Sequence, residues 1–561
     1  MKEKKRIFLD NISQDFNFRN DLVIGPWCLK HNFSLDEIFN FKLKEIFLEN
    51  KLYNDPGNYQ SVERQHRRLL EEMAKYFKQI NSGDKSINYY KNYINYWFLF
   101  IIHALQNSAT IGSLYLEKYK NQEIELVKYY KIDEMKFKNT HDFVYKICFD
   151  EIWFSNLIFE FLKTNLHKNW NIKYLNLNRE KNNIPKENSI VKLKNFLKGC
   201  LFPRVKSVYG FSFIEKIILS TFLQFKKPIK ESMKNQNYYT NMKTNDVRLI
   251  LSDEKVLELA KKFLPSSFKN IPYKKIKKNS NKGKIMLCAP SSLFFNEKDQ
   301  LDLLSFQESG GEIIPVQHGA CYADLYFPTS PIEYSFSRFI SWGQKSHPNL
   351  DATFDPLPSP QLKKIKYNFK SNKILFVSTS GIFYGPRFGS RDFTDSYFRY
   401  NNTLHFFKNI NPDLIKNFEY KEMKPNHFSE VDLLKKNYKD LKFTSLKPES
   451  YLRKTKLVVM NNYSTFFYKC LVSNIPTILL TKKNTWKLHD EAKKIYNLLE
   501  ECQISFSDMP KAAEEINVKF NTIEEWWFSQ NVQRVRKIFC DKYANSSENY
   551  FKHWLKYLRE L

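Results

Sequence analysis

Glycine is scarce in this sequence, with 14 residues among 561. No G-x-G-x-x-G follows a predicted strand and no P-loop motif occurs, so the sequence supports neither a Rossmann dehydrogenase nor a P-loop nucleotide-binding protein. The eight cysteines form no C-x-x-C pair. Their scatter indicates neither a zinc site nor a disulfide framework, and it fits a reducing compartment.

Long hydrophobic runs are missing too. The longest, residues 96–105, is about half the length of a membrane span and predicts a buried helix. The basic N-terminus contains only the apolar run "IFL", which is too short for a signal peptide. We therefore expect a soluble, cytoplasmic protein in which any membrane contact is peripheral.

Negative charge is in deficit: 89 Lys and Arg stand against 60 Asp and Glu, a net charge of +29. Such an excess is typical of a protein with an acidic partner, which is nucleic acid, anionic lipid or a phosphorylated substrate. A sequence that is simply rich in Lys, Asn, Ile, Phe and Tyr is the alternative, and the dispersal of the basic residues favours it. The basic residues are dispersed, however, and the aromatic residues follow the spacing of helix cores. A nucleic-acid-binding protein needs the two clustered together, so we rank that function below an enzyme.

A chain of this length is too long for one hydrophobic core, and its pattern changes near residue 280. Before that point the sequence predicts long helices, such as 86–106 and 141–166, interrupted by strands at 6–12 and 171–178. Beyond it, short apolar runs alternate with helical lengths, which is typical of parallel sheets. The predicted strands lie within 284–292, 312–319, 338–343, 373–381, 419–427, 456–465 and 475–481.

A proline-dotted segment, 346–364, divides this strand series and is the best candidate for a linker. The expected fold class is α/β and GT-B-like: two Rossmann-like parallel-sheet lobes facing a cleft, with large helical additions in the N-terminal half. We expect an acceptor-side lobe at 1–350, a nucleotide-donor lobe at 365–520, and helices at 521–561 packing back across both. In such sheets, ligands bind beyond the carboxyl ends of the strands.

The first candidate site is the strand end "QHG", Gln317 to Gly319. Because imidazole titrates near neutral pH and glycine lets a backbone approach a ligand, His318 is well placed to act as a general base. A hydrogen-bonded structural histidine is the alternative, and for an isolated histidine it is the commoner case. The position at a strand end is what favours the functional interpretation.

Three further segments carry candidate phosphate-binding groups. "MKPNHF" places Lys424 and His427 at one strand end, where an ordinary Pro-Asn turn is the alternative. "NNYST" places Asn462 before Ser464 and Thr465, whose hydroxyls could cap a helix or hold a phosphate against its dipole. The loop 378–393 contains two arginines that could contact phosphate or sugar or simply be solvated, Arg387 and Arg391.

The ordered series "QHG", "KPNH" and "NNYST…NIPTILL" resembles a GT-B superfamily that includes CDP-glycerol glycerophosphotransferases and the Kdo transferases of bacterial capsules. The whole chain is also similar to a family of bacterial surface-polysaccharide transferases. That similarity is carried by "FLDNISQDF…VIGPWCL", "VQHGACY", "SRFISWG", "NNYSTFFYKCLVSNIPT" with "TWKLHDEA", and "FNTIEEWWFSQNVQRVRKIFCDKYA".

This resemblance implies that His318 is the catalytic or acceptor-side histidine, and that His427 grips the donor's phosphate together with Ser464 and Thr465. Related enzymes often carry a glutamate on the following helix to hold the nucleotide ribose, but Lys469 stands near that position here. Lys424 replaces a frequent arginine, which keeps the charge and loses the bidentate fork.

The resemblance implies a glycosyltransferase that moves a Kdo or nonulosonate sugar from a CMP-activated donor to a surface polysaccharide or lipid-linked glycan. A CDP-glycerol or polyol-phosphate transferase is the alternative. No Asp-rich metal motif stands out, so we expect a metal-independent reaction with no cofactor. The expected location is the cytoplasm, with the inner face of the cytoplasmic membrane as a possible place of contact. Possible cleft acids, which nothing ranks, are Asp10, Asp324 and Glu333.

Overall fold

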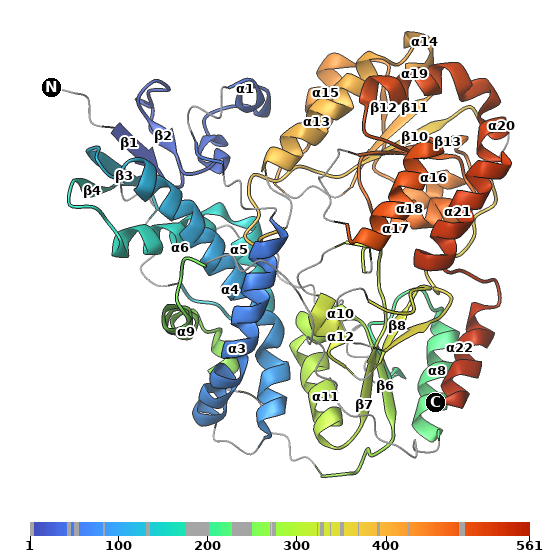
Figure 1. Cartoon of the computed structure of the whole chain (residues 1–561), viewed down its shortest axis with the longest axis horizontal. Coiled ribbons are helices and arrows are strands. Elements are labelled where there is room, and N and C mark those ends of the chain that lie inside the picture. The colour runs from blue at the N-terminus through green and yellow to red at the C-terminus, as the bar shows by residue number, and fades with distance from the viewer. Residues whose placement is uncertain are drawn as a thin grey trace.

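The structure is a computed structural model of the whole chain. In the described part, every paired strand is parallel to its neighbour. Figure 1 shows an N-terminal sheet on the left, a C-terminal sheet at the upper right and a middle sheet below it. The structure describes residues 5–41, 47–49, 55–81, 85–130, 135–175, 201–226, 249–269, 271, 277–322, 324–325, 330–336, 338–347, 353–367, 370–389, 393–423, 427–481 and 488–561.

The N-terminal sheet has the strand order β2-β1-β3-β4. Long helices cover it, as the apolar periodicity predicts. The predicted helical segment 141–166 is two helices, because the Asp150 side chain accepts from the Ile152 amide and starts a new helix there. The elements are β1 (Lys5–Phe8), β2 (Leu22–Val23), α1 (Leu35–Asn40), α3 (Pro56–Ile80), α4 (Ile87–Lys118), β3 (Ile124–Lys128), α5 (Thr140–Phe149), α6 (Glu151–Thr164), β4 (Trp170–Tyr174) and α9 (Asp253–Lys262).

Helix α4 contains the longest apolar run of the chain and is buried on nearly all sides over most of its length. The Ser86 side chain caps it by accepting from the Tyr89 amide, 3.1 Å away. Gly112 lets α6 approach closely, since a Cβ there would lie 2.5 Å from the Phe161 ring. Among the described residues, no helix is long and apolar enough to cross a membrane.

The middle sheet has the order β5-β6-β7, and a bridge between Val316 and Ile340 joins it to a two-stranded sheet, β8-β9. Its strands are short and buried. In Figure 1, α11 lies to one side of these strands, while α8 and α22 lie together to the other side. The elements are β5 (Val205–Lys206), α8 (Phe213–Phe225), β6 (Ile285–Cys288), α10 (Pro290–Phe294), α11 (Glu297–Glu308), β7 (Glu312–Pro315), α12 (Ser330–Tyr334), β8 (Phe339–Ser341) and β9 (Phe354–Pro356).

The C-terminal sheet has six strands in the order β12-β11-β10-β13-β14-β15. Its central strands are wholly buried, which explains their continuous apolar runs. The elements are β10 (Ile374–Ser378), α13 (Phe393–Lys408), α14 (Pro412–Ile415), β11 (Phe418–Glu422), α15 (Val431–Asn437), β12 (Lys442–Phe443), α16 (Pro448–Leu452), β13 (Leu457–Met460), α17 (Thr465–Val472), β14 (Thr477–Leu480), α18 (Asp490–Glu501), β15 (Ser505–Phe506), α19 (Met509–Lys519), α20 (Ile523–Trp527), α21 (Gln530–Tyr543) and α22 (Tyr550–Glu560).

The last two helices connect the C-terminal and middle sheets. Helix α21 packs on α17 and α18, and the Asn545 amide beyond it donates to the Trp342 carbonyl after β8. Helix α22 then lies on the middle sheet, where the buried Trp554 indole donates to the Pro358 carbonyl at 2.9 Å. The chain end therefore contacts both sheets.

The seven strands predicted beyond residue 280 are all present. Strands at 6–12 and 171–178 were also predicted, and β1 and β4 lie there, but their membership of a separate parallel sheet was not predicted. A short strand, β9, lies inside the proposed linker. The predicted site residues Lys424 and Arg391 lie outside the described residues.

Candidate active site

The buried Gln317 side chain holds the turn that follows β7. Its Nε2 donates to the Gly319 carbonyl at 2.8 Å, and its Oε1 accepts from the Trp342 amide at 2.7 Å. The Gln317 amide in turn donates to the Ile340 carbonyl of β8. Gln317 thus fixes the backbone around His318 and joins it to the neighbouring strand.

His318 is exposed at this turn, and its ring is connected to two buried residues. Its Nδ1 hydrogen-bonds to the Tyr322 hydroxyl, which donates to Glu333 Oε2 at 2.7 Å. Tyr322 and Glu333 are almost completely buried. The other ring nitrogen, Nε2, has no partner among the residues that the structure describes. The arrangement is a carboxyl–phenol–imidazole chain that ends in a ring nitrogen without a partner in the described part of the chain.

The pKa values of this chain differ from their ordinary values because the surrounding protein excludes water from the groups. Although the His318 residue keeps an exposed edge, desolvation of its ring lowers its pKa to about 4, so the imidazole is neutral at physiological pH. Desolvation also raises the pKa of Glu333 well above the ordinary carboxyl range, and the Tyr322 hydrogen bond opposes this rise. The protonation of Glu333 therefore decides the order of protons along the chain.

Two proton orders follow from the donors available. When Glu333 is ionised, Tyr322 donates to it and His318 Nδ1–H donates to the phenol oxygen, which leaves Nε2 as an acceptor. When Glu333 is protonated, it can donate to Tyr322, which then donates to Nδ1 and leaves a proton on Nε2. Only the first order gives His318 a free basic nitrogen.

The amino end of α17 lies directly against the His318 turn. Thr465 Oγ1 accepts from the Ala320 amide at 3.0 Å, and the Tyr468 hydroxyl accepts from the Cys321 amide at 3.4 Å. A Cβ on Gly319 would lie 3.2 Å from Thr465 Oγ1, so the glycine allows this close approach. The structure thus brings two of the predicted motifs, from different sheets, into contact.

Ser464 occupies the N-cap of α17, but its side chain makes no capping hydrogen bond. Ser464 and Asn462 are both partly exposed. The Lys469 ammonium on the same helix lies 3.5 Å from the Glu449 carboxylate of α16. This end of the helix therefore offers a hydroxyl and backbone amides to a ligand, while Lys469 pairs with an acid on the neighbouring helix.

Asp324 is fully buried behind this contact. Its Oδ2 accepts from three phenols, those of Tyr463, Tyr468 (2.8 Å) and Tyr496 (3.2 Å), which belong to the C-terminal sheet's loop and helices. Its carbonyl accepts from the His489 amide at 2.9 Å. Asp324 therefore anchors the segment after His318 to the C-terminal sheet and is not an exposed acid.

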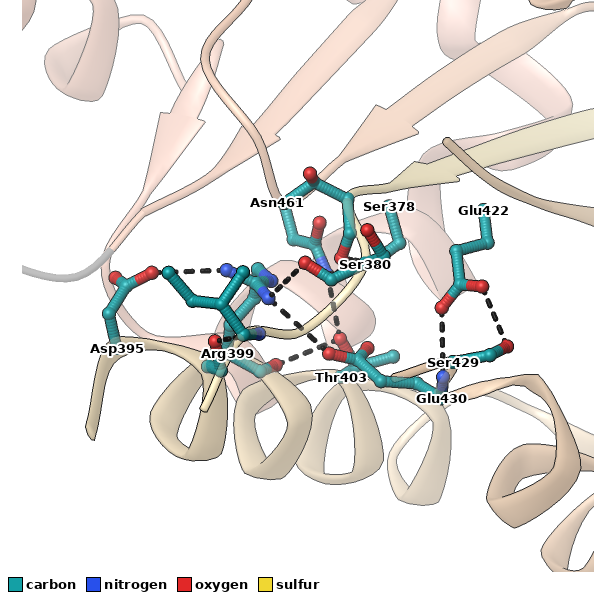
Figure 2. A network of polar contacts seen from close by, with 12 residues as sticks. Ser378, Ser380, Asp395, Arg399, Thr403, Glu422, Ser429, Glu430 and Asn461 are labelled. Atoms are coloured by element: carbon teal, nitrogen blue, oxygen red, sulfur yellow. Dashed lines mark hydrogen bonds and ion pairs between the residues drawn. The ribbon is translucent and has the colours of Figure 1, made fainter. Parts of the chain in front are cut away.

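A second polar set lies at the carboxyl edge of the C-terminal sheet (Figure 2). Ser378 and Glu422 end β10 and β11, and Asn461 follows β13. Asn461 Nδ2 donates to Ser378 Oγ and to Thr403 Oγ1, each at 2.9 Å. Glu422 accepts from the Ser429 hydroxyl at 2.6 Å and from the Glu430 amide at 2.8 Å. Three neighbouring strands thus end in a connected polar cluster.

The buried Arg399 of α13 joins this cluster. Its guanidinium contacts Asp395 at 3.1 Å, the Ser380 carbonyl at 3.2 Å and Glu430 at 3.5 Å. Burial raises the pKa of Glu430 to about 7, although Arg399 opposes the rise. Sequence reasoning missed this cluster. The available signal was a polar residue at the end of three consecutive strands, namely Ser378, Glu422 and Asn461.

His427 makes two backbone hydrogen bonds. Its Nδ1 accepts from the Phe383 amide at 2.8 Å, so Nε2 carries the ring proton and donates to the Cys148 carbonyl of α5 at 2.7 Å. The ring also stacks on Tyr384, with centroids 4.7 Å apart. To contact a phosphate, His427 would have to exchange one of these bonds, and its predicted donor-binding role stays a prediction.

Arg387 and Asp10 contact groups outside the His318 turn. The Arg387 guanidinium lies over the Phe100 ring of α4, 5.2 Å from its centroid. Asp10 is buried in the N-terminal sheet, where it forms an ion pair with Lys128 at 2.9 Å and accepts from the Tyr129 amide. Asp10 thus links the ends of β1 and β3, and its proposed acceptor-side role stays a prediction.

Comparison with known proteins defines the class of the protein. The sequence matches the family described as LIC12162 family transferase over residues 5–558, nearly the whole chain. The chain therefore belongs to the LIC12162 transferase family. No curated protein matches it. A crystal structure of the glycotransferase of kitacinnamycin is similar over 48% of this chain and 74% of that chain, with 10% identity and a TM-score of 0.29, which is too low to support an argument.

Proposed function

We propose that the protein is a GT-B-like glycosyltransferase that moves a Kdo or nonulosonate sugar from a CMP-activated donor to a bacterial surface polysaccharide or lipid-linked glycan. The observation that carries the proposal is the contact between the His318 turn and the amino end of α17. A candidate base, on a residue that is exposed at its turn, and a helix end suited to phosphate lie side by side at the strand ends of two sheets. Membership of a transferase family supports the reaction class.

In the proposed reaction, His318 Nε2 accepts the proton of the acceptor hydroxyl. The acceptor oxygen attacks the anomeric carbon of the donor sugar, and the bond between that carbon and the CMP phosphate oxygen breaks. CMP leaves with the electron pair. Tyr322 and ionised Glu333 hold the imidazole in the tautomer that can take the proton.

The leaving phosphate would be stabilised by the amino end of α17 with the hydroxyls of Ser464 and Thr465. Asn462 precedes this helix end and is proposed as a further contact. Lys424 and His427 complete the proposed donor site by resemblance, and Arg387 of the loop 378–393 is proposed as a further donor contact. Because these groups supply the positive potential, the proposed reaction uses no metal ion or other cofactor.

We place this activity in the cytoplasm, at the inner face of the cytoplasmic membrane, where lipid-linked acceptors are assembled. A CDP-glycerol or polyol-phosphate transferase is the alternative that shares the resemblance. CMP leaves in both reactions, but only the alternative moves a phosphate to the acceptor.

Nucleotide binding tests the donor site. We expect CMP to raise the melting temperature more than UDP or GDP does, and calorimetry to show about tenfold weaker CMP binding in Ser464→Ala. Ser547→Ala, near the start of α22, is the control and should bind CMP normally. Equal CMP affinity in wild type and Ser464→Ala would reject the proposed phosphate site.

A further inference from the structure

Helix α8 exposes an apolar face that the fold does not explain. Phe213, Ile214 and Phe225 are 58%, 68% and 78% exposed, and Ile217 and Ile218 are exposed between them. At helical spacing these five residues lie on one side of three turns. Soluble proteins rarely expose so many large apolar side chains together, so such a patch marks an interaction surface.

The opposite side of α8 accounts for its place in the fold. Leu219 and Leu223 are fully buried in the core that α8 shares with β5, β6 and α22. Ser212 and Glu215 form a capping box at its amino end, and Glu215 also accepts from the Tyr550 hydroxyl of α22. The inner face and the cap therefore hold the helix in place, and the outer face touches this core only where Phe213 meets Phe202.

The outer face carries no charge. Glu215 and Lys216 lie toward its flanks, and the positions between the apolar residues are Thr221 and Gln224. Two further exposed residues extend the patch toward the chain before the helix, where Phe202 contacts Phe213 with ring centroids 5.3 Å apart. These two residues are 48% exposed each, Leu201 and Tyr209.

The neighbouring helix carries exposed basic side chains. Figure 1 shows α22 beside α8, and on α22 Lys552, Lys556 and Arg559 are exposed on the side away from the buried Trp554, with Lys556 3.9 Å from the Glu560 carboxylate. The sequence after α8 is also basic, with five Lys or Arg and two Asp or Glu in 227–248. An uncharged apolar face beside a basic one is the pattern of helices that lie in the surface of an anionic bilayer.

Charge also favours one of the possible occupants. A second copy of this chain would carry the same net charge of +29, which opposes association, whereas an anionic lipid surface would attract the basic side chains of α22. We propose that α8, with Leu201 and Tyr209, is a membrane-docking surface whose apolar face enters the headgroup region of a bilayer containing anionic lipid. The basic face of α22 then lies near the lipid phosphates.

The start of α8 is linked to the candidate active site. Gly210 has a positive φ of 92°, and a Cβ there would lie 2.5 Å from the Pro360 carbonyl carbon, so the chain before α8 packs tightly on residues 360–361. The Gln361 side chain donates to the His318 carbonyl at 2.9 Å. Docking of α8 would therefore bring His318 close to the bilayer. The use of this placement for catalysis rests on the proposed function, in which the acceptor is lipid-linked.

Vesicle flotation with the full-length protein tests the proposal. We expect wild type to float with phosphatidylglycerol-containing vesicles, to bind pure phosphatidylcholine poorly, and to lose binding as salt rises. The double variant Phe213→Asp/Ile214→Asp should bind about tenfold more weakly. Val518→Asp is the matched control, because Val518 is 79% exposed on α19 and should leave binding unchanged.

The outcomes separate the alternatives. Absence of wild-type flotation, or equal flotation of the double variant with an unchanged melting temperature, overturns the proposal. A dimer in sedimentation velocity that the double variant dissociates would assign the patch to a second copy instead. Flotation needs no donor or acceptor, so it can succeed where the proposed transferase activity fails. If both hold, the double variant should retain transfer to a water-soluble acceptor.

Discussion

At the scale of single residues, the two strand-end histidines differ in what their nitrogens contact. Both nitrogens of His427 hydrogen-bond to backbone groups. His318 uses only Nδ1, on Tyr322, and its other nitrogen has no partner in the described part of the chain. A histidine held by one nitrogen and open at the other suits proton transfer, so His318 is the better candidate for a general base.

Removing the Tyr322 hydroxyl should release the His318 ring. In Tyr322→Phe we expect kcat to fall about tenfold with KM unchanged, because the substrate still binds but the imidazole no longer has a fixed tautomer. Steady-state kinetics of transfer measure this effect. Tyr438→Phe, whose hydroxyl bonds to the Leu404 carbonyl far along the chain from His318, is the control. Kinetics of Tyr322→Phe equal to wild type would remove Tyr322 from the mechanism.

The pH dependence of transfer should report the ionisation of Glu333. Because only ionised Glu333 leaves His318 Nε2 as an acceptor, kcat should rise as pH rises through the Glu333 pKa, which burial places well above the ordinary range. His318 itself becomes neutral above about pH 4, so its own titration does not cause this rise in kcat. In Glu333→Gln the rise of kcat with pH should disappear. A rise that persists unchanged in this variant would contradict the assignment to Glu333.

Sequence reasoning identified His318 because a strand end, a histidine and a glycine are adjacent in the chain. It named Glu333 as one unranked acid and did not name Tyr322. Their contact depends on how the segment between β7 and β8 folds back, which no local pattern encodes. Thr465 was predicted to grip phosphate, and its hydrogen bond to the Ala320 amide became visible only in the structure.

At the scale of elements, the C-terminal sheet buries a charge cluster beneath its strand ends. Three carboxyl groups share the buried Arg399: Asp395 and Glu430 by direct contact, and Glu422 electrostatically. Glu422 and Glu430 are buried and Asp395 is partly buried, and one guanidinium does not compensate all three acids, so burial raises the pKa of Glu430 to about 7. The cluster ties α13 to the ends of β10 and β11, which places the strand-end loops.

The raised pKa of Glu430 predicts a stability change. A carboxyl whose folded pKa of about 7 exceeds its ordinary 4.5 binds its proton more tightly in the folded state. Its contribution is therefore complete at low pH and is lost as pH rises from about 4.5 to 7, at about 1.4 kcal/mol per pKa unit.

Thermal unfolding at pH values near 5.5 and 8 checks this effect. The difference in melting temperature between the two pH values should shrink in Glu430→Gln, which cannot ionise. Glu525→Gln, on the exposed surface of α20, should leave the difference as in wild type. An unchanged difference in Glu430→Gln would show that Glu430 does not titrate in this range.

Element prediction succeeded where the pattern is local. Buried parallel strands are continuous apolar runs ended by polar residues, so β6, β7 and β10 were recognisable. Which strands pair is a long-range property, and the separate sheet formed by β1 to β4 was therefore not predicted. The Arg399 cluster escaped notice for the same reason, since its members come from different helices and strand ends.

At the scale of the whole molecule, the His318 turn belongs to the middle sheet and is anchored to the C-terminal sheet. The Asp324 carboxyl accepts hydrogen bonds from three phenols of that side, and Thr465 Oγ1 accepts one from the Ala320 amide. The closing helices α21 and α22 run from one sheet to the other. A base and a helix end are thereby held together by contacts spread over distant parts of the chain.

The most direct test of this account is the transfer reaction itself. The purified protein is incubated with a CMP-activated Kdo or nonulosonate donor and a glycan acceptor, and the products are analysed by mass spectrometry. We predict free CMP and an acceptor heavier by one sugar without phosphate, formed at least about 100-fold more slowly by His318→Ala and normally by the surface control His553→Ala. Full transfer by folded His318→Ala, or an acceptor that gains phosphate, would contradict the account.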